Sequence, residues 1–577
     1  MKRILPLPLC LTLLLGAPAV AEQASADKPA DKTSSSRTML RGAQSIGDEI
    51  VPHKFYGDLR DLPRAPVWEE GDTRLINPRR WHGEPKGEYT PAKLDPLVTQ
   101  QRSQERGQSF VTEIHNFEGV DNGATQPPDP TGEVGKNYYI HAVNSSTFAI
   151  YDKVTGAQVV APTAMDSLGS GGCTSGAGDP IIVYDAMAER WLMSEFTFGN
   201  DMCVYISMTD DPVTGGWCNY ELTAPTFPDY PKYAVWPNAY VVSTNESGGT
   251  IYAFDRANMM NCDTARPFQR MVAPALPGLG FQAFTPADVE GATGPDAGVD
   301  EPAYLLRQRD TELGNQGPNL PTSDLIEIWS FDVDWDNSQN TTLTQEPDIS
   351  VAEFDSNLCP PISFFSCVPQ PISNTDLDPL LEVIMYPVTY RKFSGYESIV
   401  GVFQTDIGDF EDHSGERWFE LRRSSPNDDW ALHQEGTYSP DEEHRFMATI
   451  AQDGDGNILM AYALSSENTS PSVRYTGRLS TDPTGVMTQP EVTLIAGTGH
   501  DGGSSRYGDY SQMSVDPVDN CTFWFTVEYT EGNFDNSLRI GAVKFDSCVG
   551  GGGGPEVFDD SFEGGDCSAW SSNTGGC

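Results

Sequence analysis

Basic residues are scarce in this sequence. Its 577 residues include 36 Lys and Arg against 83 Asp and Glu, a formal net charge of −47. Phosphate recognition depends on clustered Lys and Arg, so this balance argues against a nucleic-acid binder or a partner of anionic membranes. Apolar residues are also few, at 38%, but 22 Tyr, 26 Phe and 11 Trp are too many aromatics for a disordered chain. The composition predicts a large, folded, loop-rich protein.

The signatures of several enzyme and metal-binding classes are missing as well. The sequence has no G-x-S-x-G elbow, no H-E-x-x-H pair and no CxxC pair, and its eight His are scattered. These absences disfavour a serine hydrolase of the α/β type, a zincin and a zinc ribbon.

No apolar run reaches the length needed to span a bilayer. The first three residues are Met1-Lys2-Arg3, an apolar stretch runs from Ile4 to Leu15, and Ala19-Val20-Ala21 forms a small-x-small cleavage site. This order is typical of a secretory signal peptide at residues 1–21. We therefore expect no membrane span and a secreted or periplasmic mature protein.

The cysteine count agrees with an oxidising compartment. Eleven Cys are present, and removing Cys10 with the signal leaves an even ten. Short separations favour the pairs Cys359–Cys367, Cys521–Cys548 and Cys567–Cys577. The remaining four are left for two bridges of unspecified pairing: Cys173, Cys203, Cys218 and Cys262.

Composition divides the mature chain into four parts. Residues 22–106 are polar, without a sustained period of 2 or 3.6, and predict an extended arm or a removable pro-region. Residues 107–548 form the folded body, 549–555 a Gly-rich linker, and 556–577 a short C-terminal cap or sorting-type tail.

The folded body is repetitive. Seven times, an Asp in a turn-like context precedes a β-rich run, at Asp129, Asp179, Asp229, Asp288, Asp376 or Asp378, Asp441 and Asp509. Turn-forming Asp, Asn and Gly, such as those of residues 453–457, join the strands into hairpins. Hairpins at regular spacing without helical periodicity predict an all-β propeller of seven blades, with a β-sandwich array or a β-helix as alternatives. The strand-like residues 111–117 are expected to pair with residues 539–545 and lock the ring.

Three strings, GDPIIVYDAMAERW, DYPKYAVWP and RYGDYSQMSVDPVDNCTFWFTVEY, carry a resemblance. They are similar to a group of exported bacterial proteins with sialidase-like β-propeller folds, and the similarity covers most of residues 107–548. The resemblance implies a fold, a compartment and a ligand-binding channel. The tail VFDDSFEGGDCSAWS resembles a short sorting segment of secreted proteobacterial proteins.

The recurring Asp is the main candidate for a binding site. In a propeller the innermost strand of each blade begins near the central channel, so five carboxylates could surround one mouth: Asp129, Asp179, Asp229, Asp441 and Asp509. Like charges brought together are stabilised by a cation, and Ca²⁺ accepts six to eight oxygen ligands in flexible geometry. The alternative is that each Asp caps its own turn through backbone N–H groups.

Two functions from different classes follow. The first is a propeller that binds a ligand, a polysaccharide or a cell-surface protein at its axial face, with Ca²⁺ or another divalent cation as candidate cofactor. The second is a sialidase-like glycoside hydrolase or lyase acting on an anionic sugar, with Arg445 and Arg506 clamping a carboxylate and Asp509, Tyr510 or Glu528 as acid, base or nucleophile.

Overall fold

The computed structural model describes fourteen stretches of the chain. They are residues 38–65, 74–75, 93–104, 111–120, 125–246, 248–276, 281–291, 294–295, 301–311, 323–359, 366–410, 412–501, 504–532 and 536–549. All belong to one compact unit, Thr38–Cys577. The predicted signal peptide at 1–21 and the predicted tail at 556–577 lie outside the described residues, as does nearly all of the predicted linker.

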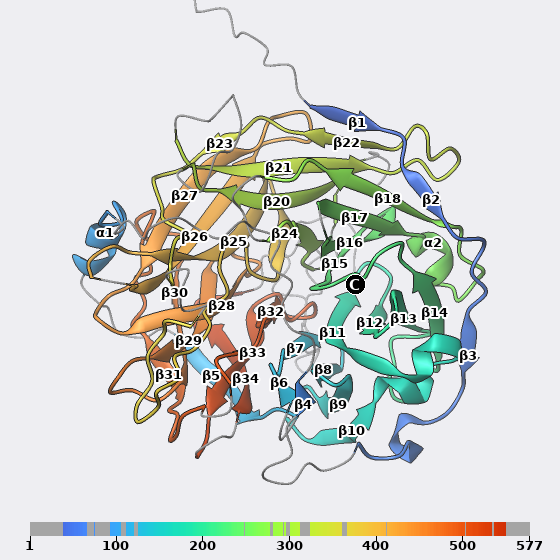
Figure 1. Ribbon diagram of the computed structural model, residues 1–577, viewed down its shortest axis with the longest axis horizontal. Helices are drawn as coiled ribbons and strands as arrows, with labels where there is room; N and C mark the ends of the chain where they lie inside the picture. The colour runs from blue at the N-terminus through green and yellow to red at the C-terminus, as the bar shows by residue number, and fades with distance from the viewer. Residues whose placement is uncertain are drawn as a thin grey trace, which may run out of the picture. The chain divides into compact units, whose positions relative to one another are not determined.

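The regular secondary structure of the described part is almost entirely β-strand, which confirms the all-β prediction. Apart from one two-stranded pair, its strands form sheets of four or five members, two of them joined edge to edge, and Figure 1 shows these sheets placed around a common centre. The short helical segments are α1 (Val98–Arg102), α2 (Arg256–Met259) and the 3-10 turns η1 (Leu59–Asp61), η2 (Met165–Leu168) and η3 (Gly171–Thr174). No described helix has the length and apolar character needed to cross a membrane.

Three sheets come from the first half of the body, each an antiparallel meander running outward from the centre. The first has β7 (Thr131–Val134), β8 (Tyr138–Val143), β9 (Thr147–Asp152) and β10 (Gln158–Ala164). The second has β11 (Gly176–Asp185), β12 (Arg190–Thr197), β13 (Asp201–Ser207) and β14 (Trp217–Thr223). The third has β15 (Lys232–Trp236), β16 (Ala239–Asn245), β17 (Gly249–Phe254) and β18 (Phe268–Ala273). Nearly every residue of inner strands such as β8, β13 and β16 is buried, because these strands pack both faces against neighbouring sheets.

The second half supplies four more groups of strands. The parallel pairing of β19 with β24 joins two of these groups into one ten-stranded sheet. The first group has β19 (Thr285–Val289), β20 (Ala303–Arg309), β21 (Leu325–Asp332), β22 (Thr342–Gln345) and β23 (Ile349–Ser350). The second has β24 (Val388–Phe393), β25 (Tyr396–Asp406), β26 (Ser414–Arg423) and β27 (Ala431–Tyr438). The third has β28 (His444–Gln452), β29 (Ile458–Ser465), β30 (Ser472–Arg478) and β31 (Val492–Ile495). The fourth has β32 (Gln512–Val515), β33 (Thr522–Thr530) and β34 (Asn536–Phe545).

The last group is completed by a strand from the start of the body. Strand β5 (Val111–Glu118) pairs antiparallel with β34, placing Ile540 opposite Phe117 and Phe545 opposite Val111. This confirms the pairing predicted between residues 111–117 and 539–545. The two ends of the folded body are therefore joined by backbone hydrogen bonds.

The core lies between neighbouring sheets. Six tryptophans are almost completely buried, two in the second sheet and one each in the third sheet and in the β19, β24 and β32 groups: Trp191, Trp217, Trp236, Trp329, Trp418 and Trp524. Burial of a large aromatic side chain is worth a few kcal/mol of hydrophobic free energy. This face-to-face packing holds the sheets in register around the centre.

The N-terminal arm is partly ordered and adds outer strands to three sheets. Strand β1 (Met39–Arg41) pairs with β22, β2 (Gln44–Ile46) with β18, and β3 (His53–Phe55) with β14. We call residues 39–55 the belt. Each belt strand has only three residues, too few for a visible period of 2, so the sequence predicts an extended arm but not its strands.

Further along the arm, strand β4 (Arg74–Leu75) pairs with β6 (Thr125–Gln126). Residues 93–104 then lie against β26 and β27, and their helix α1 contacts β27. Asp95 is buried and forms an ion pair with Arg417 of β26, with 2.5 Å between Oδ2 and Nη2. Arg102 pairs with Asp409 at 2.7 Å.

The described stretches contain four disulfides. The predicted pairs Cys359–Cys367 and Cys521–Cys548 are confirmed, and the two unspecified bridges are Cys173–Cys203 and Cys218–Cys262. The pair Cys567–Cys577 lies outside the described residues.

The Asp453–Asn457 segment is the hairpin turn between β28 and β29, as its sequence predicts. Asp453 Oδ1 accepts hydrogen bonds from the main-chain N–H groups of Asp455 and Asn457, each at 2.9 Å. Gly456 has φ +83°, a conformation that favours glycine. The carboxylate therefore closes its own turn.

Candidate functional site

Four of the five predicted Asp come together at the start of the innermost strands. Asp129 precedes β7, Asp179 lies near the start of β11, Asp229 precedes β15, and Asp509 precedes β32. Asp509 N donates to Asp129 Oδ1 at 2.6 Å, and the charges of Asp129, Asp229 and Asp509 all act on Asp179. All four side chains are buried or nearly so. We call them the four-aspartate cluster.

A repeated asparagine holds this cluster in place. Asn144 follows β8, and its Nδ2 donates to Asp129 Oδ2 at 2.7 Å while its Oδ1 accepts from Asp179 N at 3.0 Å. Asn245 ends β16 and makes the same pair of contacts one sheet further on. Its Nδ2 donates to Asp229 Oδ2 at 3.5 Å, and its Oδ1 accepts from Gln282 N at 3.2 Å. Each asparagine thus joins the Asp of its own sheet to the first strand of the next.

This geometry predicts the cost of losing one asparagine. Asn144→Ala removes the donor to Asp129 Oδ2 and the acceptor of the Asp179 N–H, so we expect the free energy of unfolding to fall by about 1–3 kcal/mol. Urea denaturation measures the change. The control is Asn137→Ala, an exposed position for which we expect less than about 0.5 kcal/mol. Equal losses for the two variants would contradict the linking role.

Aromatic residues pack beside the cluster. Tyr510 OH donates to Pro231 O at 3.0 Å and lies 3.4 Å from Asp179 Oδ2, while Tyr230 OH donates to Asp509 O at 3.1 Å. The two rings lie 4.9 Å apart, measured between their centroids. Both rings are buried, so they pack against the carboxylates inside the molecule.

Arg506 and Glu528 also lie beside the four-aspartate cluster. Arg506 Nη2 lies 2.6 Å from Asp509 Oδ2, and Glu528 Oε2 accepts from Gly508 N at 2.6 Å. Arg506, Asp509, Tyr510 and Glu528, which the sequence suggests as one catalytic set, are therefore close to one another.

Burial sets the electrostatics of this region. It raises the pKa of Asp179 well above its usual value, and the charges of Asp129, Asp229 and Asp509 raise it further while Arg506 opposes them. Burial also raises the pKa of Glu528, with additional contributions from Asp501, Asp129 and Asp509. A proton or another cation is therefore bound more favourably here than at an exposed carboxylate.

Asp441 and Arg445 are engaged with each other. Asp441 Oδ1 lies 2.8 Å from Arg445 Nη1, and Arg445 Nε lies 2.8 Å from Glu491 Oε1. The Asp441 side chain is 44% exposed, unlike the buried members of the cluster. Asp129 and Asp179 both have a positive φ, and the residue of β28 with a positive φ is Met447. Met447 is therefore the structural equivalent of these two Asp, and Asp441 shares only their residue type.

Asp288 differs in the same way. The main-chain N–H that donates to Asn144 Oδ1 belongs to Asp179, but the one that donates to Asn245 Oδ1 belongs to Gln282 and not to Asp288. Asp288 Oδ1 instead accepts from Val235 N at 2.6 Å, and its charge acts on Glu133.

A second acidic group, absent from the sequence prediction, consists of Glu133, Asp288 and Glu290. Burial raises the pKa of all three, and that of Glu290 reaches about 7. Glu133 lies in the short strand β7, Asp288 in β19 and Glu290 just after it, where a single acid gives no recognisable pattern. The charges of Glu290 and Asp288 act on Glu133, which places the three acids near one another.

Metal-ligating geometry is not preassembled in the described stretches. No group of three or more His, Cys, Asp or Glu side chains is arranged there to hold a metal ion. The calcium site at Asp129, Asp179, Asp229, Asp441 and Asp509 therefore stays a prediction.

The sequence matches no known family model and no curated protein. Among solved structures, it is similar to one described as a polysaccharide lyase of a new family, an ulvan lyase, with 11% identity, a TM-score of 0.35, and coverage of 76% of this chain and 96% of that one. It is also similar to the WD40 domain of SCAP from fission yeast, with 9% identity, a TM-score of 0.32, and coverage of 72% and 83%. These likenesses are too low to transfer an activity.

Proposed function

We propose that the protein is an exported, seven-bladed β-propeller. The contacts of the innermost strands support a ring, since β7 contacts β11, β11 contacts β15, β15 contacts β19, β19 contacts β24, β24 contacts β28, β28 contacts β32, and β32 contacts β7. The β5–β34 pairing supports closure. Four disulfides and the signal-like N-terminus support export, because disulfides persist in oxidising compartments.

The function proposed for this propeller is binding of a ligand, a polysaccharide or a cell-surface protein at the face that carries the four-aspartate cluster. The observation that carries the proposal is that four different first strands bring their carboxylates to one buried place, where Arg506 pairs with Asp509. A divalent cation, with Ca²⁺ as the candidate, would bind there by reorienting the Asp side chains.

Calorimetry with calcium tests this proposal. We expect CaCl₂ to bind the purified protein at micromolar to millimolar Kd and to raise its melting temperature by a few degrees at saturating concentration. Asp179→Asn removes one ligand while keeping a hydrogen-bonding side chain, so we expect at least a tenfold weaker Kd. Asp441→Asn, outside the cluster, is the matched control. Absence of binding heat and of any shift in melting temperature, with and without EDTA, would overturn the cation-binding role.

The second candidate is a sialidase-like glycoside hydrolase or lyase acting on an anionic sugar. The proximity of Arg506, Asp509, Tyr510 and Glu528 favours it, since a carboxyl with a raised pKa can act as a general acid beside a guanidinium that clamps a carboxylate. Arg445 has no part in it, because Asp441 and Glu491 hold its guanidinium. Reducing-end assays on uronate and sialate glycans, repeated with Arg506→Ala, distinguish it from a pure binding role.

A further inference from the structure

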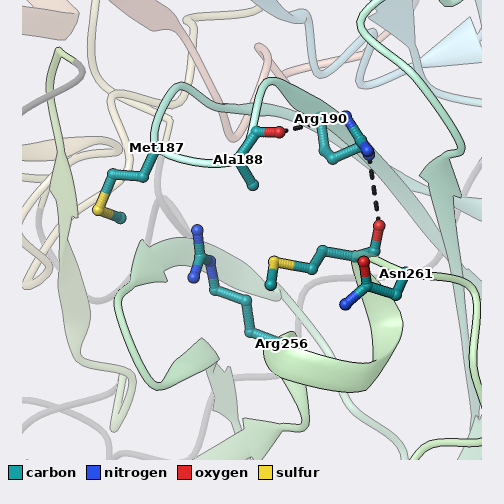
Figure 2. Close-up of a pocket in the computed structure, with 6 residues that line it drawn as sticks. Met187, Ala188, Arg190, Arg256 and Asn261 are labelled. Carbon is teal, nitrogen blue, oxygen red and sulfur yellow. Dashed lines mark hydrogen bonds between the residues drawn. The ribbon is translucent and has the colours of Figure 1, made fainter.

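A cavity of about 310 Å³ lies between two neighbouring sheets. It is lined by Met187, Ala188, Arg190, Arg256, Met260 and Asn261. Figure 2 shows the turn between β11 and β12 on one side and helix α2 with the following residues on the other. Its volume is at the lower end of the range for small-molecule sites.

One buried carboxylate fastens both walls of the cavity. Asp185 Oδ1 accepts from Ala188 N at 3.0 Å, which closes the β11–β12 turn. The same carboxylate takes both Nε and Nη2 of Arg256, at 2.6 and 2.8 Å, in a bidentate pair. Tyr240 OH donates a fourth hydrogen bond to this carboxylate at 3.2 Å. Arg256 is therefore fixed in position and its charge is balanced.

The wall formed by α2 is also rigid. Asp255 caps the helix and holds Arg266 in a second bidentate pair. The disulfide Cys218–Cys262 follows directly after Asn261, and Tyr220 OH donates to Asp263 O at 2.8 Å. A cavity between two walls that are held this way needs little ordering when a ligand binds.

Of the two arginines that line the cavity, Arg256 is paired with Asp185, and Arg190 is available to pair with an anionic ligand. The Arg190 guanidinium donates to the main-chain carbonyls of Met260, Ala188 and Glu189, and no ion pair joins it to a carboxylate in the described stretches. The adjacent Glu189 side chain is paired with Lys136. The lining contains no Asp or Glu, although acids outnumber bases 83 to 36 in the chain.

We propose that this cavity binds a small monoanion with an apolar segment, of the medium-chain carboxylate class. Arg190 pairs with the carboxylate, while Arg256, whose charge Asp185 already balances, lines the opposite wall (Figure 2). The flexible thioethers of Met187 and Met260 contact the apolar segment.

The cavity is separate from the four-aspartate cluster. Asp179 lies near the start of β11 and Asp185 at its end, six residues further along. At a rise of about 3.3 Å per residue they are about 20 Å apart, on opposite ends of the same strand. Binding at the cavity thus goes beyond the function proposed above and fails or succeeds independently of it.

Calorimetry with octanoate tests the proposal on the whole mature protein at pH 7. We expect saturable binding of one octanoate per chain, no binding of 1-octanol, and at least tenfold weaker binding of inorganic sulfate. Arg190→Gln is expected to weaken octanoate binding at least tenfold, whereas Arg190→Lys keeps the charge and stays within about threefold of wild type.

The control is Lys54→Gln, which removes an exposed cation that does not line the cavity; we expect an unchanged Kd. Met187→Glu places a carboxylate in the cavity and should abolish binding while the melting temperature stays within a few degrees. Equal octanoate affinity for wild type and Arg190→Gln would overturn the proposal, as would equal binding of octanoate and 1-octanol.

Discussion

Replacing Arg417 by Ala is expected to lower the free energy of unfolding by about 3–5 kcal/mol, since the buried Asp95 carboxylate would lose its cation. Arg417 also donates to Thr437 Oγ1 at 2.7 Å and to the carbonyls of Ala352 and Glu353 at 2.9 and 3.0 Å. The variant therefore loosens residues 93–104 from β26 and β27 together. Urea denaturation gives the free energy, and limited proteolysis detects release of the arm.

The control for this prediction is Lys93→Ala. Lys93 forms an ion pair with Glu353, but its side chain is 83% exposed, so we expect a loss below about 1 kcal/mol. A small effect of Arg417→Ala, equal to that of Lys93→Ala, would mean that the arm does not depend on the buried pair.

Stability is expected to fall by several kcal/mol between pH 5 and pH 9. Burial, together with the charge of Asp166, raises the pKa of Glu195 to about 8, and burial raises that of Glu416 to about 8 and that of Asp406 to about 7. The folded state then binds these protons more tightly than the unfolded state does. The resulting stabilisation is complete below about pH 4, where the unfolded carboxyls also titrate, and is lost as pH rises through 7 to 8.

Urea denaturation at five pH values in EDTA measures this dependence. Glu195→Gln keeps an acceptor for Tyr205 OH, which lies 2.6 Å from Glu195 Oε1, but cannot ionise. We expect this variant to be more stable than wild type at pH 9 and to have a flatter profile. The exposed Glu442→Gln should follow the wild-type curve. A wild-type profile that is flat from pH 5 to 9 would contradict the prediction.

Much of the fold could be predicted from local patterns. Alternating apolar residues and Asp-Gly turns identify hairpins such as β28–β29, and short Cys separations identify Cys359–Cys367 and Cys521–Cys548. The β5–β34 pairing follows because a repeated architecture leaves one strand short at the end of the chain. Hairpins and short-range disulfides can be predicted because their partners are close in sequence. The β5–β34 pairing can be predicted because the number of strands leaves the last sheet one strand short.

The candidate site was predictable only in part. Repetition of Asp identified four members of the cluster because each precedes or begins an innermost strand. The repetition of Asp failed to predict the equivalent residues in two sheets. In β28 that residue is Met447 rather than Asp441, and before β19 it is Gln282 rather than Asp288. Asn144, Asn245 and the acid group of Glu133, Asp288 and Glu290 were missed, because their role arises from contacts between sheets. The Asn that recurs near the end of the second strand of two sheets was the available signal.

The belt has a consequence for how the chain reaches its folded state. Belt strand β1 pairs with β22, some three hundred residues later, β2 with β18 and β3 with β14, so during synthesis the belt strands meet their partners in an order opposite to their own. Such distant pairing gives a high contact order and slow folding. Once paired, the belt covers the outer edges of three sheets and removes them as templates for aggregation. A chain still being synthesised therefore leaves these three edges uncovered until its middle third has emerged.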